Sequence, residues 1–130
     1  MVSFQSSVTK ETFQISDVIT CKDCPMVYVI ECTKCAHHPQ YVGKTAQSLM
    51  VRGRQHITNV DKGNLEGFGV MGSGRMYAHF TTNNHSSRDM RIYGIEVVHG
   101  ADPATLSVRE RFWMNKLDTN RHPGLNTYRT

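Results

Sequence analysis

The sequence predicts one compact domain of mixed α/β type (α+β), in which a β-hairpin and a later strand combine with amphipathic helices. Two β-branched or aromatic runs lie close together, at residues 27–30 and 40–43, and a third follows at 91–98. Apolar residues at helical spacing lie between and after these runs. A chain of 130 residues has room for a single hydrophobic core, so we expect one active site.

Composition and charge narrow the class of protein. The chain has a net charge of +4 and a pI near 9.0, which suits a polyanionic partner without establishing one. It has no apolar run of the roughly 20 residues that a membrane helix needs, and its start lacks the features of a secretory signal. We therefore expect an intracellular protein that does not enter membranes. Its four cysteines are then thiols or metal ligands rather than disulfides.

The elements follow in order along the chain. Residues 1–20 are rich in Ser, Thr and Gln, and we interpret them as a loose lead-in or an edge strand before a domain at 21–130. The runs at 27–30 and 40–43 predict a hairpin. Thr45 or Ser48 can then cap a helix to about residue 60, which places Leu49, Arg52, Gly53 and His56 on one stripe.

The second half continues with a glycine-rich stretch at 63–74, which predicts a loop before a short helix at about 76–80. The run at 91–98 predicts a largely buried strand, and a helix is expected over about 105–117. In that helix Leu106, Trp113, Met114 and Leu117 define the buried stripe, and Glu110 falls between Met114 and Leu117 on a helical wheel. A carboxylate thus stands where an apolar side chain belongs.

A carboxylate in such a place is exposed at the end of the stripe, paired with a base, or bound to a metal. The ordinary interpretation is an ion pair with Arg52, Arg54 or Arg109. Arg52 and His56 are ordinary surface residues unless Glu110 and a phosphate are their partners.

Five blocks of the sequence together resemble the GIY-YIG endonuclease family. They cover roughly residues 26–126, in the family's order: Met26-Val27-Tyr28, then Tyr41-Val42-Gly43-Lys44-Thr45, Leu49-x2-Arg52-x3-His56, Arg109-Glu110-x2-Trp113 and Gly124-Leu125-Asn126. The first block departs from the pattern, with Met26-Val27 where the family name has Gly-Ile. Those are packing positions, and the catalytic residue types are all retained.

The resemblance implies a small three-stranded antiparallel sheet flanked by helices and a DNA endonuclease that leaves 5′-phosphate and 3′-hydroxyl ends. Glu110 would be the only protein ligand of a catalytic Mg²⁺ or Mn²⁺, which commonly takes one or two carboxylates with phosphate oxygens. Arg52 would neutralise charge on the phosphate. The expected DNA contacts are Lys44, Arg52, Arg54 and Asn126.

By the same resemblance, Tyr28 or Tyr41 activates the water, with His56 orienting or relaying the proton. Tyr28 is the first choice. A phenol with a pKa near 10 is a poor base, and Lys44, Arg52 and His56 are expected to lower that pKa. The alternatives are that both tyrosines only pack in the sheet, and that Asn126 caps a turn after Gly124 rather than positioning the site.

The cysteines suggest a second metal site. Cys21-x2-Cys24 and Cys32-x2-Cys35 have zinc spacing, but an intervening strand would separate the pairs by roughly 25 Å, so they cannot share one ion. The hairpin cysteines can instead share a zinc ion with histidines near the middle helix, and this set resembles the endonuclease of Penelope-like retroelements. The predicted ligands of this structural zinc are Cys32, Cys35, His79 and His85. The alternatives are free thiols, His37 or His38 as competing ligands, and a metal shared by Cys21 and Cys24 with another chain.

The leading hypothesis is therefore a nuclease. Its expected partners are DNA and a reverse transcriptase domain in a larger polyprotein. We expect a nuclear location if the source is a eukaryotic retroelement. A zinc-stabilised nucleic-acid binding module without cleavage is the second hypothesis. A protein-interaction domain is the third. Dependence on a divalent cation separates cleavage from simple binding. The sequence leaves open the target site, the oligomeric state and whether one or both strands are cut.

Overall fold

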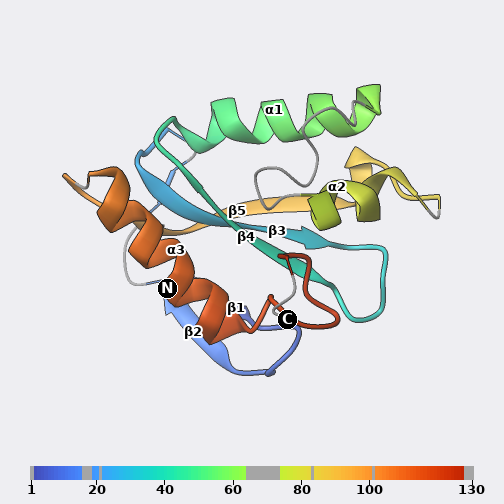
Figure 1. The fold of residues 1–130 in the computed structure, drawn as a ribbon, viewed down its shortest axis with the longest axis horizontal. Coiled ribbons are helices and arrows are strands. Elements are labelled where there is room, and N and C mark those ends of the chain that lie inside the picture. The colour runs from blue at the N-terminus through green and yellow to red at the C-terminus, as the bar shows by residue number, and fades with distance from the viewer. Residues whose placement is uncertain are drawn as a thin grey trace.

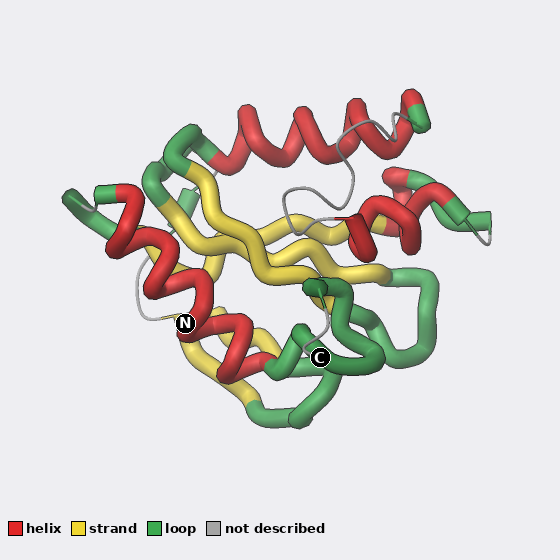
Figure 2. The backbone as a smooth tube through the Cα atoms, viewed as in Figure 1, coloured by secondary structure: helices red, strands yellow, loops and turns green. Residues whose placement is uncertain are grey.

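A computed structural model describes residues 2–15, 19–20, 22–63, 74–82, 84–100 and 102–127. These residues form an α+β domain with two antiparallel sheets and three α-helices (Figures 1 and 2). The elements are β1 (Val2–Gln5), β2 (Thr12–Ile15), β3 (Met26–Cys32), β4 (Gln40–Thr45), α1 (Leu49–Lys62), α2 (Gly74–Thr81), the short 3₁₀ helix η1 (Ser87–Asp89), β5 (Met90–Val97) and α3 (Pro103–Leu117).

The larger sheet has the order β4-β3-β5, and both pairs are antiparallel, as predicted. Side chains of a strand alternate between the two faces of its sheet. Tyr28 and Cys32 of β3 face the core under α1 and α2 together with Tyr41 of β4. Val27 and Val42 face the opposite core, where α3 and the β1–β2 hairpin pack. Figure 1 shows α1 and α2 on one side of the sheet and α3 with the hairpin on the other.

The N-terminal segment differs from the predicted loose lead-in. Residues 2–15 contain a second, two-stranded sheet, and Phe4 and Ile15 are buried in the α3-side core. The ring of Phe4 lies 5.6 Å from that of Phe13 and 5.7 Å from that of Trp113. Ser6 Oγ donates to the carbonyl of Leu117, at the end of α3, at 2.7 Å. Because the contacts with Trp113 and Leu117 come from α3, more than 100 residues away in sequence, local composition did not reveal them.

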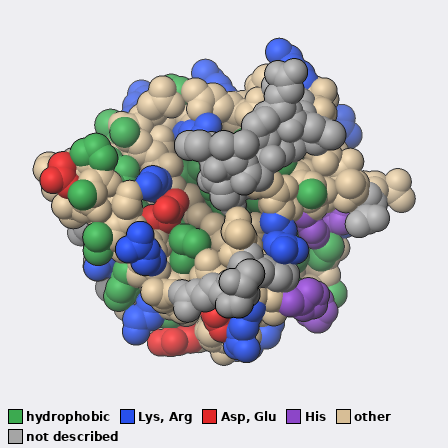
Figure 3. Space-filling model, viewed as in Figure 1, with side chains coloured by type: hydrophobic (Ala, Val, Ile, Leu, Met, Phe, Trp, Pro, Cys, Tyr) green, Lys and Arg blue, Asp and Glu red, His purple; other side chains and the backbone are tan. Residues whose placement is uncertain are grey.

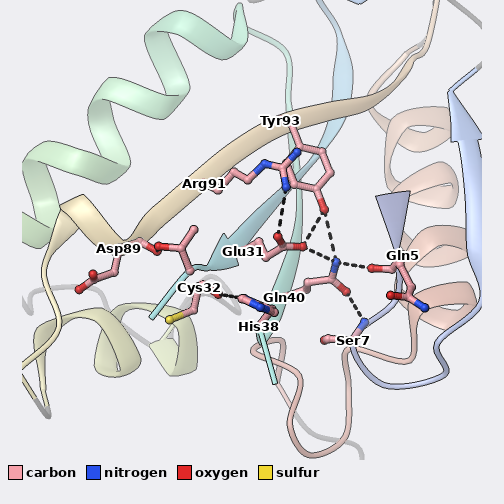
Figure 4. A network of polar contacts seen from close by, with 10 residues as sticks. Gln5, Ser7, Glu31, Cys32, His38, Gln40, Asp89, Arg91 and Tyr93 are labelled. Carbon is pink, nitrogen blue, oxygen red and sulfur yellow. Dashed lines mark hydrogen bonds and ion pairs between the residues drawn. The ribbon is translucent and has the colours of Figure 1, made fainter. Parts of the chain in front are cut away.

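A buried amide fixes this hairpin to the larger sheet (Figure 4). The side chain of Gln40 is fully buried, and its Nε2 donates to the carbonyl of Gln5 at 2.8 Å and to Glu31 Oε1 at 2.9 Å. Its Oε1 accepts from the backbone N–H of Ser7 at 2.9 Å, and the Tyr93 hydroxyl donates to the same carboxylate at 3.1 Å. A satisfied buried network of this kind specifies how two elements join.

Helix α1 begins after Ser48, whose side chain accepts from the Val51 N–H, and ends at Gly63, which has a φ of 59°. Its buried residues are Leu49, Gly53, His56 and Val60, which confirms the predicted stripe with Arg52 at its margin. The helix continues two residues beyond the predicted end. Most of the predicted glycine-rich loop, residues 64–73, lies outside the described residues.

Helix α3 begins two residues earlier than predicted, because Asp102 caps it and Pro103 suits its first turn. Leu106 and Leu117 are buried, whereas the other two residues of the predicted stripe are only half-buried. Within the described part of the chain, no helix combines the length and apolar character required to span a bilayer.

Candidate active site and metal centre

Two tyrosines meet at the β4 edge of the larger sheet, on the side of α1. Tyr28 of β3 is paired in register with Gly43 of β4, and its ring lies directly over that glycine. A Cβ at position 43 would stand 2.5 Å from Tyr28 Cζ, closer than real Cβ contacts allow. The Tyr41 ring lies 6.5 Å from that of Tyr28. Gly43 is therefore what allows the Tyr28 phenol to lie across β4.

His56 of α1 links Tyr28 to a third tyrosine. Its Nε2 lies 2.6 Å from the Tyr28 hydroxyl, and its Nδ1 lies 2.5 Å from the hydroxyl of Tyr77 on α2. The imidazole is fully buried, and burial, aided by the charge of Arg52, lowers its pKa to about 3. His56 is therefore neutral at physiological pH.

The tyrosines do not have the lowered pKa expected from the sequence. Burial raises the pKa of Tyr28, and the charge and hydrogen-bonding contribution of Arg52 offsets this only in part. Burial likewise raises the pKa of Tyr41 well above its usual value. The expectation that His56 contributes a cationic field is wrong, because the imidazole is uncharged. Tyr28 can act on a proton only if its own proton moves at the same time.

Glu110 approaches the same edge from α3, on the other face of the sheet. It lies in an open cleft of about 380 Å³, and Lys44 Nζ is 4.0 Å from its carboxylate. Lys44 also donates to Ser107 Oγ at 2.5 Å. Burial raises the pKa of Glu110, and Lys44 opposes the rise. The predicted ion pair with Arg109 is absent among the described residues, because Arg109 binds another carboxylate.

That other carboxylate is Glu96 of β5. Arg109 donates to both of its oxygens at 3.0 Å, and Trp113 Nε1 donates to Oε1 at 2.8 Å. This arrangement holds the middle of α3 against β5. Glu110, the residue after Arg109, is thereby turned toward β4 and the cleft.

The two α1 arginines differ in their surroundings. Arg52 is half-buried, its Nη1 donates to Gln55 Oε1 at 2.9 Å, and its charge acts on both Tyr28 and Tyr41. Arg54 is exposed and lines a shallow groove on the outer surface of α1 together with Arg52. Arg52 therefore belongs to the tyrosine cluster, whereas Arg54 belongs to the surface beside it.

The Glu110 cleft is compatible with a divalent cation. Its carboxylate is half-buried, and among the described residues its one ion pair is the long contact with Lys44, which leaves coordinating capacity on its oxygens. Ser107 and Asn115 add oxygen atoms to the lining. Hard cations such as Mg²⁺ accept such a set because most of their ligands are waters or phosphate oxygens.

Asn126 is buried and holds the outer edge of β4. Its Oδ1 accepts from the Val42 N–H at 2.8 Å and its Nδ2 donates to the Val42 carbonyl at 3.0 Å. The N–H of Leu125 donates to the Gln40 carbonyl at 2.8 Å, which extends this pairing. Both amide atoms are thus bound to the strand between Tyr41 and Gly43. Asn126 positions the site through the backbone of β4.

The four predicted zinc ligands come together at the other end of the sheet. The ligand atoms of Cys32, Cys35, His79 and His85 all lie within 4.8 Å of one another. Cys35 Sγ is 3.7 Å from His79 Nε2 and 3.2 Å from His85 Nε2. Metal–ligand bonds of about 2.0–2.3 Å in a tetrahedron require separations of about this size. This cluster can hold a metal ion, as predicted.

Hydrogen bonds from neighbouring groups orient the side chains of this cluster. His85 Nδ1 lies 3.2 Å from the Thr82 carbonyl, so its Nε2 is left with a lone pair for a metal. The Cys35 N–H donates to Cys32 Sγ at 3.5 Å. Of the predicted competitors, His38 is bonded through Nδ1 to the Cys32 carbonyl. Cys24 is exposed, and Cys21 lies outside the described residues.

Two residues of these sites were not predicted from the sequence. Glu96 is one polar position within the predicted strand, but Arg109 and Trp113, four residues apart in the following helix, are a signal for a shared partner. Tyr77 lies between Met76 and Ala78, and this apolar setting gives no sign of a polar role. Comparison of the chain with models of protein families, with curated proteins and with solved structures found no match.

Proposed function

We propose that this protein is a metal-dependent DNA endonuclease of the GIY-YIG type, with a structural zinc ion in the Cys/His cluster. One observation carries the proposal: a phenol pair, an imidazole, a guanidinium and a carboxylate meet around the edge of β4. They come from four elements, β3, β4, α1 and α3. An ordinary core would have no reason to collect five such groups, because each is costly to bury without a partner. They are Tyr28, Tyr41, Arg52, His56 and Glu110.

The proton path in this proposal begins at a water beside Tyr28. The Tyr28 oxygen takes a proton from the water while its own proton passes to His56 Nε2, 2.6 Å away. The resulting hydroxide attacks phosphorus, and the bond to the 3′ oxygen breaks. His56 is uncharged beforehand, so it can accept this proton, and an approaching phosphate anion stabilises the imidazolium.

Charge on the phosphate would be balanced by two further groups. Arg52 would donate to the non-bridging oxygens as negative charge builds there. Glu110 would hold Mg²⁺ or Mn²⁺. When bound, the cation supplies Lewis-acid stabilisation of the phosphate and of the departing 3′ oxygen.

The basic side chains favour DNA as the substrate. Lys44 of β4 and Arg54 of α1 are both exposed, and the chain carries a net charge of +4. Figure 3 shows basic side chains on several parts of the visible face, with acidic and basic groups side by side over α3. Binding through phosphates weakens steeply with salt. The spacing of the zinc cluster also supports the Penelope-like subgroup, with a reverse transcriptase domain as a possible neighbour.

The test is conversion of supercoiled plasmid to nicked and linear DNA in Mg²⁺ or Mn²⁺. Wild-type protein should cut, while Glu110→Gln and Arg52→Ala should lose about a hundredfold or more, because each removes stabilisation of the transition state. Glu11→Gln and Arg88→Ala are matched controls, since both positions are exposed and neither lines the Glu110 cleft. These controls should retain wild-type activity.

Two outcomes would contradict the proposal. Wild-type protein that retards DNA in a gel but never cuts it would favour the zinc-stabilised binding module. Cleavage that survives Glu110→Gln at wild-type rate would exclude Glu110 as the catalytic metal ligand. The ratio of nicked to linear product reports whether one or both strands are cut.

A further inference from the structure

The outer side of α1 carries a shallow groove, which the proposed mechanism uses only at Arg52. Its volume is about 560 Å³. The lining residues all belong to α1: Val51, Arg52, Arg54, Gln55, Thr58 and Asn59. Three of them, Val51, Gln55 and Thr58, are exposed and fall at helical spacing, so they form one stripe along the helix. We call this stripe, with Arg52 and Arg54 beside it, the α1 face.

The α1 face adjoins the tyrosine cluster. Arg52 Nη1 donates to Gln55 Oε1 at 2.9 Å, and Gln55 Nε2 donates to Gln47 Oε1 at 3.3 Å. Asn59, about two turns after Arg52 on the same side of the helix, donates to the Tyr77 hydroxyl at 3.2 Å. The arginine that binds the scissile phosphate in the proposed mechanism is therefore bonded directly to the stripe. DNA held at Arg52 would lie beside Gln55.

Charge is distributed across the α1 face as a DNA groove requires. Arg52 and Arg54 are two residues apart, which directs them to nearly opposite sides of the helix, with Gln55 between them on the outer surface. The major groove of B-form DNA is about 12 Å wide, with base edges at its floor and a phosphate backbone at each rim. A helix that enters this groove needs cations on both flanks and uncharged polar groups between them. The α1 face has this order.

Acidic groups lie away from this surface. The described residues that line the groove include no acidic one, and α1 contains a single acidic residue, Asp61. Asp61 lies about two turns beyond Arg54, outside the groove, and accepts from Ser87 Oγ of η1 at 2.5 Å. Figure 3 shows basic side chains along the upper rim of the visible face, over α1. The α1 face therefore suits a polyanion better than a protein partner, which would need carboxylates opposite both arginines.

The stripe carries the groups that distinguish bases. An amide such as that of Gln55 can bind the N6 and N7 edge of adenine, the Thr58 hydroxyl can donate or accept, and the methyl groups of Val51 can contact a thymine methyl. Each amide atom of Gln55 makes one printed-length hydrogen bond to a neighbouring side chain, which leaves a second lone pair on Oε1 and a second hydrogen on Nε2. These neighbours therefore orient the amide without exhausting it.

We propose that the α1 face reads DNA sequence in the major groove beside the cut bond, with Gln55 and Thr58 on base edges and the two arginines on the two backbones. The inference rests on the proposed nuclease function, because that function places the scissile phosphate at Arg52. It deepens the function by assigning the substrate as a B-form duplex that is cut with a sequence preference. An RNA duplex is not a substrate of this kind, because side chains cannot read its deep and narrow major groove.

The first arm of the test measures binding without cleavage. Zinc-loaded protein is titrated onto a labelled DNA duplex without added Mg²⁺ or Mn²⁺, and fluorescence anisotropy reports the Kd. Gln55→Glu should weaken binding by about tenfold or more, because it places a carboxylate between the two backbones. Gln14→Glu is the matched control, since it makes the same change of charge at an exposed residue of β2, in the hairpin on the opposite face of the larger sheet. It should change the Kd by less than about twofold.

Groove-binding dyes complete this arm. Methyl green, which occupies the major groove, should displace the protein from the duplex. Netropsin, which occupies the minor groove, should not.

The second arm reads the cleaved ends. Sequencing of the ends produced from a randomised DNA duplex should show a base preference close to the cut for the wild type. Gln55→Ala should weaken that preference by about tenfold, since a good contact with a base edge discriminates by about that factor. Gln14→Ala should retain it. A uniform loss of rate with an unchanged preference would mean that Gln55 only orients Arg52, and would overturn the inference.

The two arms separate this inference from the proposed function. Equal Kd values for Gln55→Glu and Gln14→Glu, or displacement by netropsin alone, would overturn the inference even if the protein cuts DNA. If the protein binds duplex DNA as expected but never cuts it, the nuclease function fails and the DNA-reading role of the α1 face stands. If it binds no duplex DNA, both proposals fail.

Discussion

The two faces of the larger sheet bury different kinds of side chain. Toward α1 and α2 they include Tyr28, Tyr41 and Cys32, with His56 packed against the phenols. Toward α3 and the hairpin they are aliphatic, as with Val27, and covered by aromatic rings. On the first face each polar group depends on a neighbour for its hydrogen bonds. On the second, burial of apolar surface favours the folded state together with the Gln40 network and the contacts of Glu96 with α3. The proposed chemistry places the tyrosines and His56 on the first face and Glu110 on the second, at the β4 edge.

The two carboxylates beside α3, Glu96 and Glu110, also differ in how fully neighbouring groups bind them. Glu96 is bound by Arg109 and Trp113 at hydrogen-bonding distance. Glu110 has one lysine at 4.0 Å and a raised pKa. Glu96 therefore joins α3 to β5, whereas the partly buried charge of Glu110 lowers stability, as we expect of a group that binds a cation in the proposed function.

The largest expected effect comes from removing metal from the Cys/His cluster. A chelator, or Cys35→Ser, should lower the free energy of unfolding by about 3 kcal/mol or more and Tm by about 10 °C, because a structural metal contributes its binding energy to folding. The measurement is thermal unfolding with and without added zinc. Cys24→Ser is the matched control, since Cys24 is exposed and outside the cluster. Equal Tm values for the two variants, with no bound zinc, would exclude a structural metal.

The next effect tests the neutral histidine. The pKa of His56 is lowered by the fold, so the unfolded chain binds the proton first as pH falls. Stability should be complete above the free pKa of about 6.5 and decline below it, until the folded-state pKa of about 3 is reached. The loss should be about 2–3 kcal/mol near pH 4.5, as each unit corresponds to about 1.4 kcal/mol. Urea unfolding at several pH values should show a shallower decline for His56→Gln. Parallel curves would contradict a buried neutral His56.

The smallest effect compares the two carboxylates directly. Glu96→Gln should lower the free energy of unfolding by about 1–3 kcal/mol, because a charge-assisted pair with Arg109 is weakened. Glu110→Gln should raise it by at most about 1 kcal/mol near pH 7. Its folded pKa is raised, so ionisation opposes folding, and stability is lost as pH rises through that pKa. Urea unfolding of both variants measures the difference, and a destabilised Glu110→Gln would reverse the comparison.

Local patterns predicted most of the elements. The β-branched runs around Val29 and Ile95 and the spacing of His56 after Leu49 correspond to β3, β5 and α1. The grouping of the two cysteines and two histidines that can hold a metal ion was predicted because spacing and residue type together are restrictive. Ser48 was one of two predicted caps, and it is the observed one.

Contacts between distant segments were not predicted. The β1–β2 hairpin has short, polar-rich strands, and it packs against distant residues such as the ring of Trp113 and the amide of Gln40. Likewise, nothing near Tyr77 in sequence indicates His56, 21 residues earlier. The expected lowering of the tyrosine pKa was wrong for the same reason: nearby cations in the sequence suggested a lower pKa, whereas burial of Tyr28 and Tyr41 in three dimensions raises it.

Because Tyr28 approaches Gly43 so closely, a substitution at one of these two positions requires a compensating substitution at the other. Any side chain at position 43 must occupy the space of the phenol, so a change there is tolerated only with a smaller residue at position 28. In a library randomised at both positions, selection for folding alone would accept many exchanged pairs. Selection for DNA cleavage would recover the original pair, because an exchange that fills the space with carbon removes the hydroxyl beside His56. The two selections would thus separate the contribution of this contact to packing from its contribution to chemistry.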